Sequence, residues 1–125
     1  MHEIITSSQN PRVQLVRSLL NQPKARRKQL AFTAEGSRLV EDGLRSSLPV
    51  QFLLVRDGHS SRVEELLAGL APEFPIFTVE TQLFDSLSET EISQGILAVF
   101  ELPKPNPPTQ PDFLLILDQV RDPGN

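Results

Sequence analysis

Four basic side chains lie close together near the start of the chain, namely Lys24, Arg26, Arg27 and Lys28. Clustered lysine and arginine are the side chains that contact nucleic-acid phosphates, and each contact releases a condensed counterion. The cluster therefore predicts a phosphate-contacting patch, for which all four side chains must be exposed. The alternative is a solvated loop between two elements.

The charge distribution favours the phosphate-contacting patch. Residues 1–38 carry seven Lys/Arg and two Glu, a net charge of +5, whereas residues 39–125 carry five basic and fourteen acidic residues, a net charge of −9. The two parts add up to the −4 of the whole chain. A basic first third on an acidic protein indicates a local anionic partner.

A second candidate anion site is a predicted helix start. Asn10 is a good N-cap, and Pro11 suits the first helical position, where its missing N–H costs nothing. A helix N-terminus favours an anion, so Arg12 in the first turn would complete a phosphate site. The alternative is an ordinary cap with an exposed arginine.

Two glycine-containing turns supply the other candidates. In the first turn, Glu35 can hold an arginine or a ribose hydroxyl, and Arg38 can contact RNA one helical turn later. In the second turn, Gln94 can read a base or a ribose beside Gly95. The alternatives are a strand-to-helix turn at Gly36 and a bend that enters a strand at Gly95.

Other chemistry finds no support in the sequence. There is no cysteine, and neither His2 nor His59 has a partner at ligand spacing, so no metal site is expected. Seven Phe without Tyr or Trp argue against base stacking and favour recognition of a folded RNA by shape and phosphates. No apolar run approaches the ~20 residues of a membrane span. We expect a cytoplasmic protein with structured RNA as its partner and no membrane contact.

The elements that must position these residues follow from apolar periodicity. It predicts a helix that begins after Asn10 and ends before Pro23, a helix over 37–47, one that opens at a Ser61–Glu64 capping box, and one over 81–87. Short strands are predicted over 30–34, 50–55, 76–79 and 95–100. The run 50–55 is almost entirely apolar, as in a strand buried on both faces. Alternating strands and helices predict an α/β sandwich with a mostly parallel or mixed sheet.

The composition changes after this part of the chain. Residues 102–112 hold five of the eleven prolines, which predicts a semi-rigid linker. An apolar run over 113–117 then predicts a buried strand, followed by Asp122-Pro-Gly-Asn125. A strand and a turn with nothing after them are expected of the first element of a missing domain, so we expect the chain to be a fragment.

The end of the chain, Leu117-Asp-Gln-Val-Arg-Asp-Pro-Gly-Asn125, resembles the motif that opens the catalytic domain of SpoU/TrmH-family RNA ribose 2′-O-methyltransferases. The front is similar to the substrate-binding domain of the same family. The motifs that carry this similarity are Ser8-x-Asn10-Pro11, the basic stretch, Phe32-x-x-Glu35-Gly36-x-Arg38-Leu39-Val40 and Gln94-Gly95-Ile96-Leu97-Ala98. The resemblance covers essentially the whole chain.

The resemblance implies that residues 1–101 form an RNA substrate-binding domain, a three-layer α/β/α sandwich similar to the kink-turn-binding ribosomal proteins. Residues 102–112 would be the linker, and residues 113–125 the first strand and turn of a missing trefoil-knot (SPOUT) methyltransferase domain. The parent enzyme would be a homodimer through that domain. It would use S-adenosylmethionine to methylate a ribose 2′-hydroxyl of rRNA or tRNA.

The resemblance carries over one catalytic-motif residue, Asn125. The catalytic arginine and the cofactor loops of the family come after it, so the fragment alone is expected to bind no cofactor and to be inactive. Two rival interpretations are a stand-alone, non-enzymatic RNA-binding protein of the kink-turn type and a module that only mediates dimerisation. The terminal strand and turn argue against the first rival, and the basic first third argues against the second.

Overall fold

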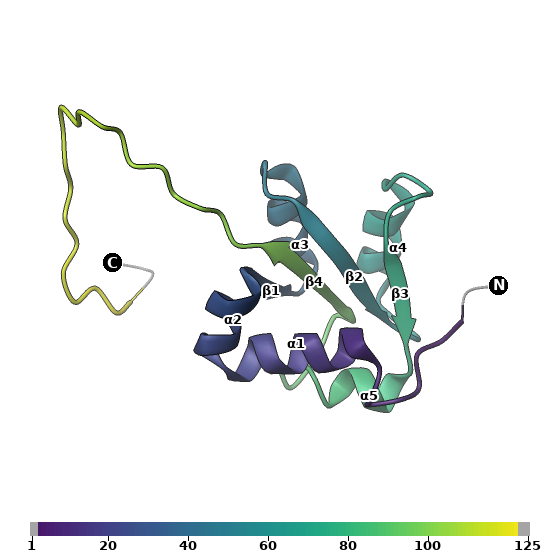
Figure 1. The fold of residues 1–125 in the computed structure, drawn as a ribbon. Coiled ribbons are helices and arrows are strands. Elements are labelled where there is room, and N and C mark those ends of the chain that lie inside the picture. The colour runs from purple at the N-terminus through teal and green to yellow at the C-terminus, as the bar shows by residue number, and fades with distance from the viewer. Residues whose placement is uncertain (1–2, 123–125) are drawn as a thin grey trace.

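The computed structural model describes residues 3–122. Its helices and strands alternate along the chain, as the periodicity predicts (Figure 1). Their order is α1 (Pro11–Asn21), α2 (Pro23–Gln29), β1 (Ala31–Glu35), α3 (Ser37–Arg45), β2 (Val50–Arg56), α4 (Ser61–Ala68), β3 (Ile76–Val79), α5 (Thr81–Asp85) and β4 (Ile96–Glu101).

The four strands form one mixed sheet in the order β1-β4-β2-β3. Strand β4 is antiparallel to both of its neighbours, β1 and β2, whereas β2 and β3 are parallel. Strands β1 and β3 are therefore the two edges of the sheet. At the β3 edge the N-terminal arm adds one parallel bridge, in which the Ile5 N–H donates to the Thr78 carbonyl at 2.8 Å.

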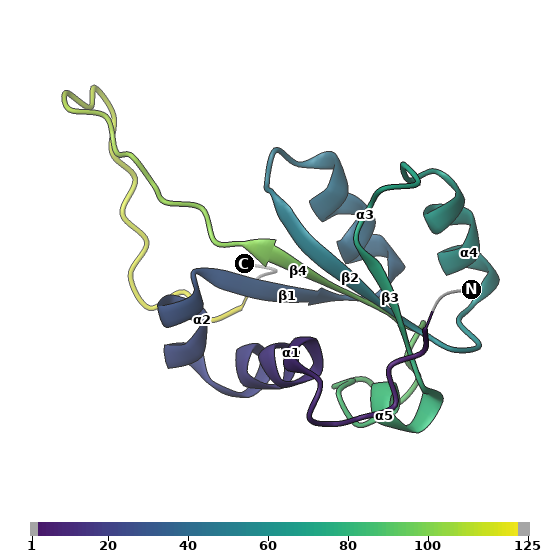
Figure 2. The same ribbon diagram turned by 45° about the vertical axis from the view of Figure 1, so that its right-hand side comes forward.

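Helices cover both faces of the sheet, and each face has its own apolar core (Figure 2). On one face α1 and α5 pack on side chains that include Leu54 and Leu97. On the other face α3 and α4 pack on side chains that include Leu53 and Ala98. Residues of β2 thus alternate between two buried faces, which confirms the prediction made from the apolar run 50–55.

Helix α1 begins and ends where the sequence predicts. The Oδ1 atom of Asn10 accepts a hydrogen bond from the Arg12 backbone N–H at 3.0 Å, and Pro11 occupies the first turn. The basic stretch that follows is not a loop, because Pro23 starts the second short helix, α2. Leu30 ends α2 in the left-handed conformation with φ of 49°, so β1 begins at Ala31 rather than at Leu30.

The predicted capping box of α4 is wrong by one residue. Ser60, not Ser61, is the N-cap, and its hydroxyl accepts from the Val63 N–H at 3.3 Å. With the helix starting from Ser60, Val63 lies in the core with no exposed surface. Burial of Val63 therefore accounts for Ser60 rather than Ser61 as the N-cap. The Glu64 carboxylate is free of the cap and lies 2.5 Å from Nε2 of His59.

Residues 102–122 form neither helix nor strand, and all of them are exposed. The strand expected over 113–117 is not formed, and its large side chains are 71–84% exposed. A strand needs a hydrogen-bonded neighbour, and this segment has none in the structure. None of the helices over residues 3–122 is long and apolar enough to cross a membrane.

Candidate nucleic-acid interface

Helix α2 presents three exposed cations, Lys24, Arg27 and Lys28. Arg27 and Lys28 lie in its last turn, where the helix dipole favours positive charge. Within residues 3–122 none of the three forms a salt bridge, so their charges are available to an external anion. These three side chains are exposed, as a phosphate-contacting patch requires, and the contact with phosphate stays a prediction.

Arg26 differs from its neighbours, and its predicted exposure is wrong. Its side chain is half-buried and donates from Nη1 to the Leu19 carbonyl of α1 at 2.6 Å. The last carbonyls of a helix lack partners inside the helix, and an arginine beyond the helix end is well placed to supply one. Arg26 therefore joins α2 to α1 through this hydrogen bond.

The two glycine turns that the sequence analysis selected meet at one end of the sheet. The Gly36 N–H donates to the Ile96 carbonyl at 3.0 Å, which joins the end of β1 to the start of β4. Gly95 has φ of +87°, and a Cβ there would lie 3.0–3.1 Å from atoms of His59 and Arg56. Gly36 likewise has φ of +91°, so both turns need glycine for a structural reason, as the alternative interpretation proposed.

Gln94 caps helix α3 from another part of the chain. Its Oε1 atom accepts from the backbone N–H and from the hydroxyl of Ser37, each at 2.7 Å. Gly36 at the N-cap position has no side chain to do this. The carbonyl end of Gln94 is thus occupied by protein, which leaves only its amide nitrogen for an external group.

Glu35 organises the loop that precedes β4. Its carboxylate accepts hydrogen bonds from the hydroxyls of Ser88 and Thr90 and from the Glu89 N–H, the last at 3.2 Å. The partner that the sequence analysis named was an arginine or a ribose hydroxyl, and in the structure the partners are protein hydroxyls. Glu35 therefore shapes the loop that carries Gln94.

Arg38 lies beside this network, in the first turn of α3. It is exposed, and within the described part of the chain its guanidinium forms no hydrogen bond or salt bridge with another residue. Leu39 next to it is 60% exposed. Arg38 thus presents an unneutralised cation at the end of the sheet where β1 finishes.

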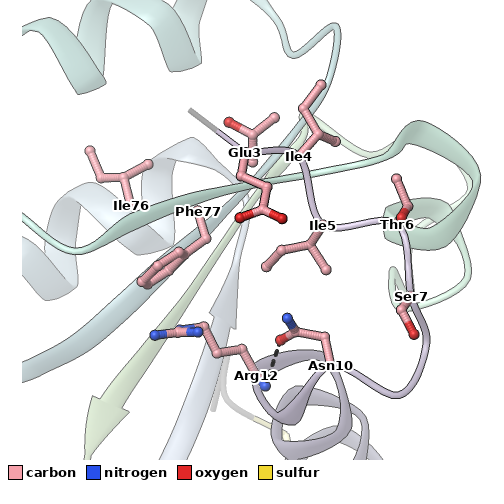
Figure 3. Close-up of a pocket in the computed structure, with 10 residues that line it drawn as sticks. Glu3, Ile4, Ile5, Thr6, Ser7, Asn10, Arg12, Ile76 and Phe77 are labelled. Carbon is pink, nitrogen blue, oxygen red and sulfur yellow. Dashed lines mark hydrogen bonds between the residues drawn. The ribbon is translucent and has the colours of Figure 1, made fainter. Parts of the chain in front are cut away.

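Arg12 lies at the opposite edge, beside β3. Its guanidinium carbon stands 3.7 Å from the centre of the Phe77 ring, a cation–π contact. The two side chains line a cavity of about 430 Å³ between the N-terminal arm, α1 and β3 (Figure 3). Asn10 also lines the cavity, but its Oδ1 atom already accepts from the Arg12 N–H, so the cap itself is an ordinary one.

The predicted RNA-contacting residues therefore fall at two edges of the sheet. Strand β1 lies between α2, with its three cations, and the first turn of α3, with Arg38, since both helices pack against it. Asn10 and Arg12 belong to the β3 edge. The structure does not bring these two groups together. Asn125 lies outside the described residues.

Two features escaped the sequence analysis. The first is the contact of Arg12 with Phe77. The sequence pattern of Phe77 is that of an ordinary core residue in a short strand, and no spacing rule relates it to Arg12.

The second is an ion pair. Arg56 binds Asp85 through two hydrogen bonds, from Nε at 2.8 Å and from Nη2 at 3.1 Å. These bonds lower the pKa of the Asp85 carboxyl from its ordinary value and raise that of the Arg56 guanidinium. The pair ties β2 to α5.

Comparison with known proteins places this geometry in a family. The profile of the MRM3-like substrate binding domain matches residues 10–98, which contain every element from α1 to α5 and the first half of β4. The chain belongs to that family. This confirms the resemblance to SpoU/TrmH RNA 2′-O-methyltransferases, because the named relatives of the domain are enzymes of that kind.

Two curated relatives of this substrate binding domain are rRNA methyltransferases. The 23S rRNA (guanosine(2553)-2′-O)-methyltransferase RlmP of Bacillus subtilis is 34% identical over 121 residues, which are 97% of this chain and 46% of the relative. Mouse mitochondrial rRNA methyltransferase 3 is 28% identical, over 91% of this chain and 29% of the relative. The chain thus spans half or less of the length of these relatives.

Solved structures share the fold. An RNA 2′-O ribose methyltransferase superposes with a TM-score of 0.71 at 27% identity, over 90% of this chain and 43% of that chain. An rRNA methyltransferase from Sinorhizobium meliloti, solved with AdoMet bound, gives 0.62 at 26% identity, over 81% and 37%. The mixed α/β sheet predicted from the sequence therefore also occurs in a part of known methyltransferase chains.

Proposed function

We propose that this chain is the RNA-binding domain of an S-adenosylmethionine-dependent rRNA 2′-O-ribose methyltransferase. Its task is to hold a structured RNA so that a catalytic domain reaches one ribose. The observation that carries this proposal is the match of residues 10–98 to a substrate binding domain, together with 34% identity to a 23S rRNA methyltransferase over 97% of the chain. Such a domain contributes orientation and local concentration rather than bond making.

The surface that fits the RNA lies along β1. We define the β1-edge surface as Lys24, Arg27, Lys28 and Arg38, the exposed cations without a salt bridge on the two helices that pack on this strand. None of the four has a salt bridge within residues 3–122, so none is neutralised before RNA arrives. Unpaired cations can contact the phosphates of an RNA helix and so position the helix on the protein without reading its sequence.

In this proposal Glu35 and Gln94 act through other residues. Glu35 holds the loop at 88–90, and Gln94 caps the helix that presents Arg38. Both are positioning residues of the β1-edge surface, and their own oxygens are directed at protein donors. The amide nitrogen of Gln94 is the one group of this network that remains for RNA.

The methyl transfer belongs to residues beyond this domain. The segment 113–117, which leads into the catalytic motif in the family, is exposed here without a sheet, so these residues do not fit a cofactor site. We propose that the parent enzyme binds S-adenosylmethionine and dimerises through the trefoil-knot domain, joined by a linker over 102–112. Residues 1–125 alone are proposed to be inactive and to bind no cofactor.

A stand-alone RNA-binding protein of the kink-turn type is the rival. A sandwich similar to the kink-turn-binding ribosomal proteins suits both proposals, because it would bind structured RNA in either case. The curated relatives favour the enzyme, since both carry the name of an rRNA methyltransferase.

Fluorescence anisotropy tests the proposal directly. The probe is a synthetic RNA hairpin that carries the 23S rRNA sequence around guanosine 2553, the nucleotide in the name of the Bacillus subtilis relative, and a DNA hairpin of the same sequence is the control. We expect saturable binding to the RNA hairpin that is tighter than binding to the DNA hairpin, whose groove shape differs. Equal binding of both hairpins, or binding of neither, contradicts the proposal.

A further inference from the structure

The cavity at the β3 edge lies outside the β1-edge surface. Its volume of about 430 Å³ is within the range of small-ligand pockets, about 300–1,000 Å³. Ile5, Ile76 and Phe77 give it an apolar wall. Figure 3 shows Glu3 directed into the cavity from the N-terminal arm and Arg12 from α1.

The Arg12 guanidinium is fixed in place while its hydrogen-bonding capacity is unused. The Phe77 ring lies 3.7 Å from the guanidinium carbon, which holds the planar group against an apolar surface. Within residues 3–122 the side chain forms no salt bridge or hydrogen bond. A guanidinium offers five N–H donors in a rigid fork that matches phosphate geometry, so Arg12 is preorganised for an anion.

The edge of β3 adds backbone groups to the same cavity. Ile5 forms a parallel bridge with Val79, in which its N–H donates to the Thr78 carbonyl, and none of the backbone hydrogen bonds of residues 3–122 continues this ladder to Ile76. Alternate residues of a strand direct their N–H and C=O groups to opposite sides, so Ile76 and Thr78 face outward, towards the arm. Both residues line the cavity, where the Ile76 carbonyl and the Thr78 N–H are available.

Glu3 gives the cavity a second kind of polar group. Its carboxylate accepts hydrogen bonds only, and no salt bridge joins it to Arg12 among the described residues. A ligand that fills the cavity must therefore present an anion to Arg12, hydroxyl or amino donors to Glu3 and an apolar face to Phe77 and the isoleucines. A ribonucleotide has these three parts, namely phosphate, ribose hydroxyls and base.

We propose that this cavity binds one unpaired nucleotide of RNA. Arg12 holds the phosphate, Glu3 accepts from a ribose hydroxyl, and the base lies against the apolar wall. The 2′-hydroxyl is the group by which a protein distinguishes RNA from DNA at a given site, so Glu3 makes the cavity selective for RNA. The proposal rests on the RNA-binding function proposed above and adds a separate subsite at the opposite edge of the sheet.

The test uses the trinucleotides r(AAA) and d(AAA), which are too short to fold, with the whole 125-residue chain. In an NMR titration we expect r(AAA) to shift the Ile5 and Thr78 amide signals and the Arg12 Nε signal, and to bind more tightly than d(AAA). Arg12→Ala should weaken r(AAA) binding roughly tenfold, as expected when a hydrogen bond to a charged group is removed. Arg12→Lys, which keeps the charge without the planar fork, should lie between.

Glu3→Gln gives the result that is specific to the ribose contact. It should bring r(AAA) and d(AAA) to equal affinity and should strengthen d(AAA) binding, because a carboxylate no longer repels the phosphate. The matched control is Arg62→Ala, which removes an exposed arginine of α4 outside both the cavity and the β1-edge surface and should leave the r(AAA) titration unchanged. Equal binding of the two trinucleotides by the wild-type chain, unchanged affinity in Arg12→Ala, or shifts confined to α2 and α3 overturns the proposal.

This outcome is separable from that of the proposed function. Binding of r(AAA) in the cavity without binding of the rRNA hairpin would refute the proposed function and leave the subsite standing. Binding of the hairpin without r(AAA) shifts at Ile5 and Thr78 would refute the subsite and leave the function standing.

Discussion

The Oε1 atom of Gln94 lies 2.7 Å from both the backbone nitrogen and the hydroxyl oxygen of Ser37, a residue 57 positions earlier in the chain. This contact closes the first turn of α3 with a side chain from the loop before β4. It also links Arg38, the cation in that turn, to the loop that Glu35 holds. Gln94 therefore supports both the stability of α3 and the proposed RNA surface, and two substitutions there should separate the two roles.

Gln94→Ala should destabilise the domain by about 1 kcal/mol, the usual cost of removing a helix cap. Gln94→Glu keeps an acceptor, and its charge suits a helix N-terminus, so its stability should stay near that of the wild type. The same charge should weaken RNA binding through repulsion of phosphate. Urea unfolding and hairpin binding, measured on both variants, check this. A Gln94→Glu variant with wild-type RNA affinity would show that no phosphate approaches α3.

Arg26 and Arg27 are adjacent in sequence, but their substitution by alanine should change different properties of the protein. Arg26→Ala removes the hydrogen bond to the Leu19 carbonyl and should cost about 1–3 kcal/mol of stability. Arg27→Ala should change stability by less than ~0.5 kcal/mol, because the side chain is exposed, and should weaken RNA binding. Thermal unfolding and RNA titration of both variants provide the comparison. Equal stability of the two variants would mean that the Arg26 contact is not formed in solution.

The contrast between these arginines shows what sequence patterns decide and what they leave open. Periodicity and composition placed the four strands of the sheet within one residue at each end, although the strand predicted over 113–117 is not formed. They also indicated which segment is basic. They could not separate Arg26 from its neighbours, since its partner is a carbonyl of another helix and depends on how α1 and α2 pack.

In the candidate site, too, local sequence predicted which residues matter but not which partners they contact. Glu35, Arg38 and Gln94 were selected from two glycine-containing turns, and the structure brings those turns together. Their tasks were not predictable, because the hydroxyls that bind Glu35 lie 53 and 55 residues away. The contact of Arg12 with Phe77 likewise arises from the pairing of β3 with the N-terminal arm, for which local sequence gives no signal.

The ion pair of Arg56 with Asp85 predicts a pH-dependent contribution to stability. Hydrogen bonds from Arg56 lower the pKa of Asp85 below its ordinary value of 3.8 in the folded state. A lowered pKa gives stability that is present above the ordinary value and is lost as the pH falls through the folded-state value. Asp85→Asn should therefore be less stable than wild type at pH 7, and the difference should shrink below about pH 4. Urea unfolding at pH 7, 5 and 3 measures this difference in unfolding free energy. A difference that does not change with pH would exclude the ion pair as its cause.

Removal of residues 102–125 should leave the domain folded. Residues 102–122 are exposed throughout and contain no helix or strand, whereas both cores end at β4. The truncated chain should keep the unfolding midpoint of the full chain and be more soluble, because the exposed apolar run 113–117 is gone. Limited proteolysis of the full chain should cut first between 102 and 112. A large fall in the unfolding midpoint would show that the segment packs on the domain.

The salt dependence of hairpin binding tests the central claim, that the exposed cations of α2 bind RNA phosphates. The variant is Lys24→Ala, Arg27→Ala and Lys28→Ala together, with Glu64→Gln and Glu65→Gln as the control on the acidic part of the chain. The slope of log K against log salt should become shallower by ~0.7 to 0.9 for each phosphate that the variant no longer neutralises, with unchanged circular dichroism, while the control keeps affinity and slope. Unchanged affinity and an unchanged slope in the triple variant would contradict the account.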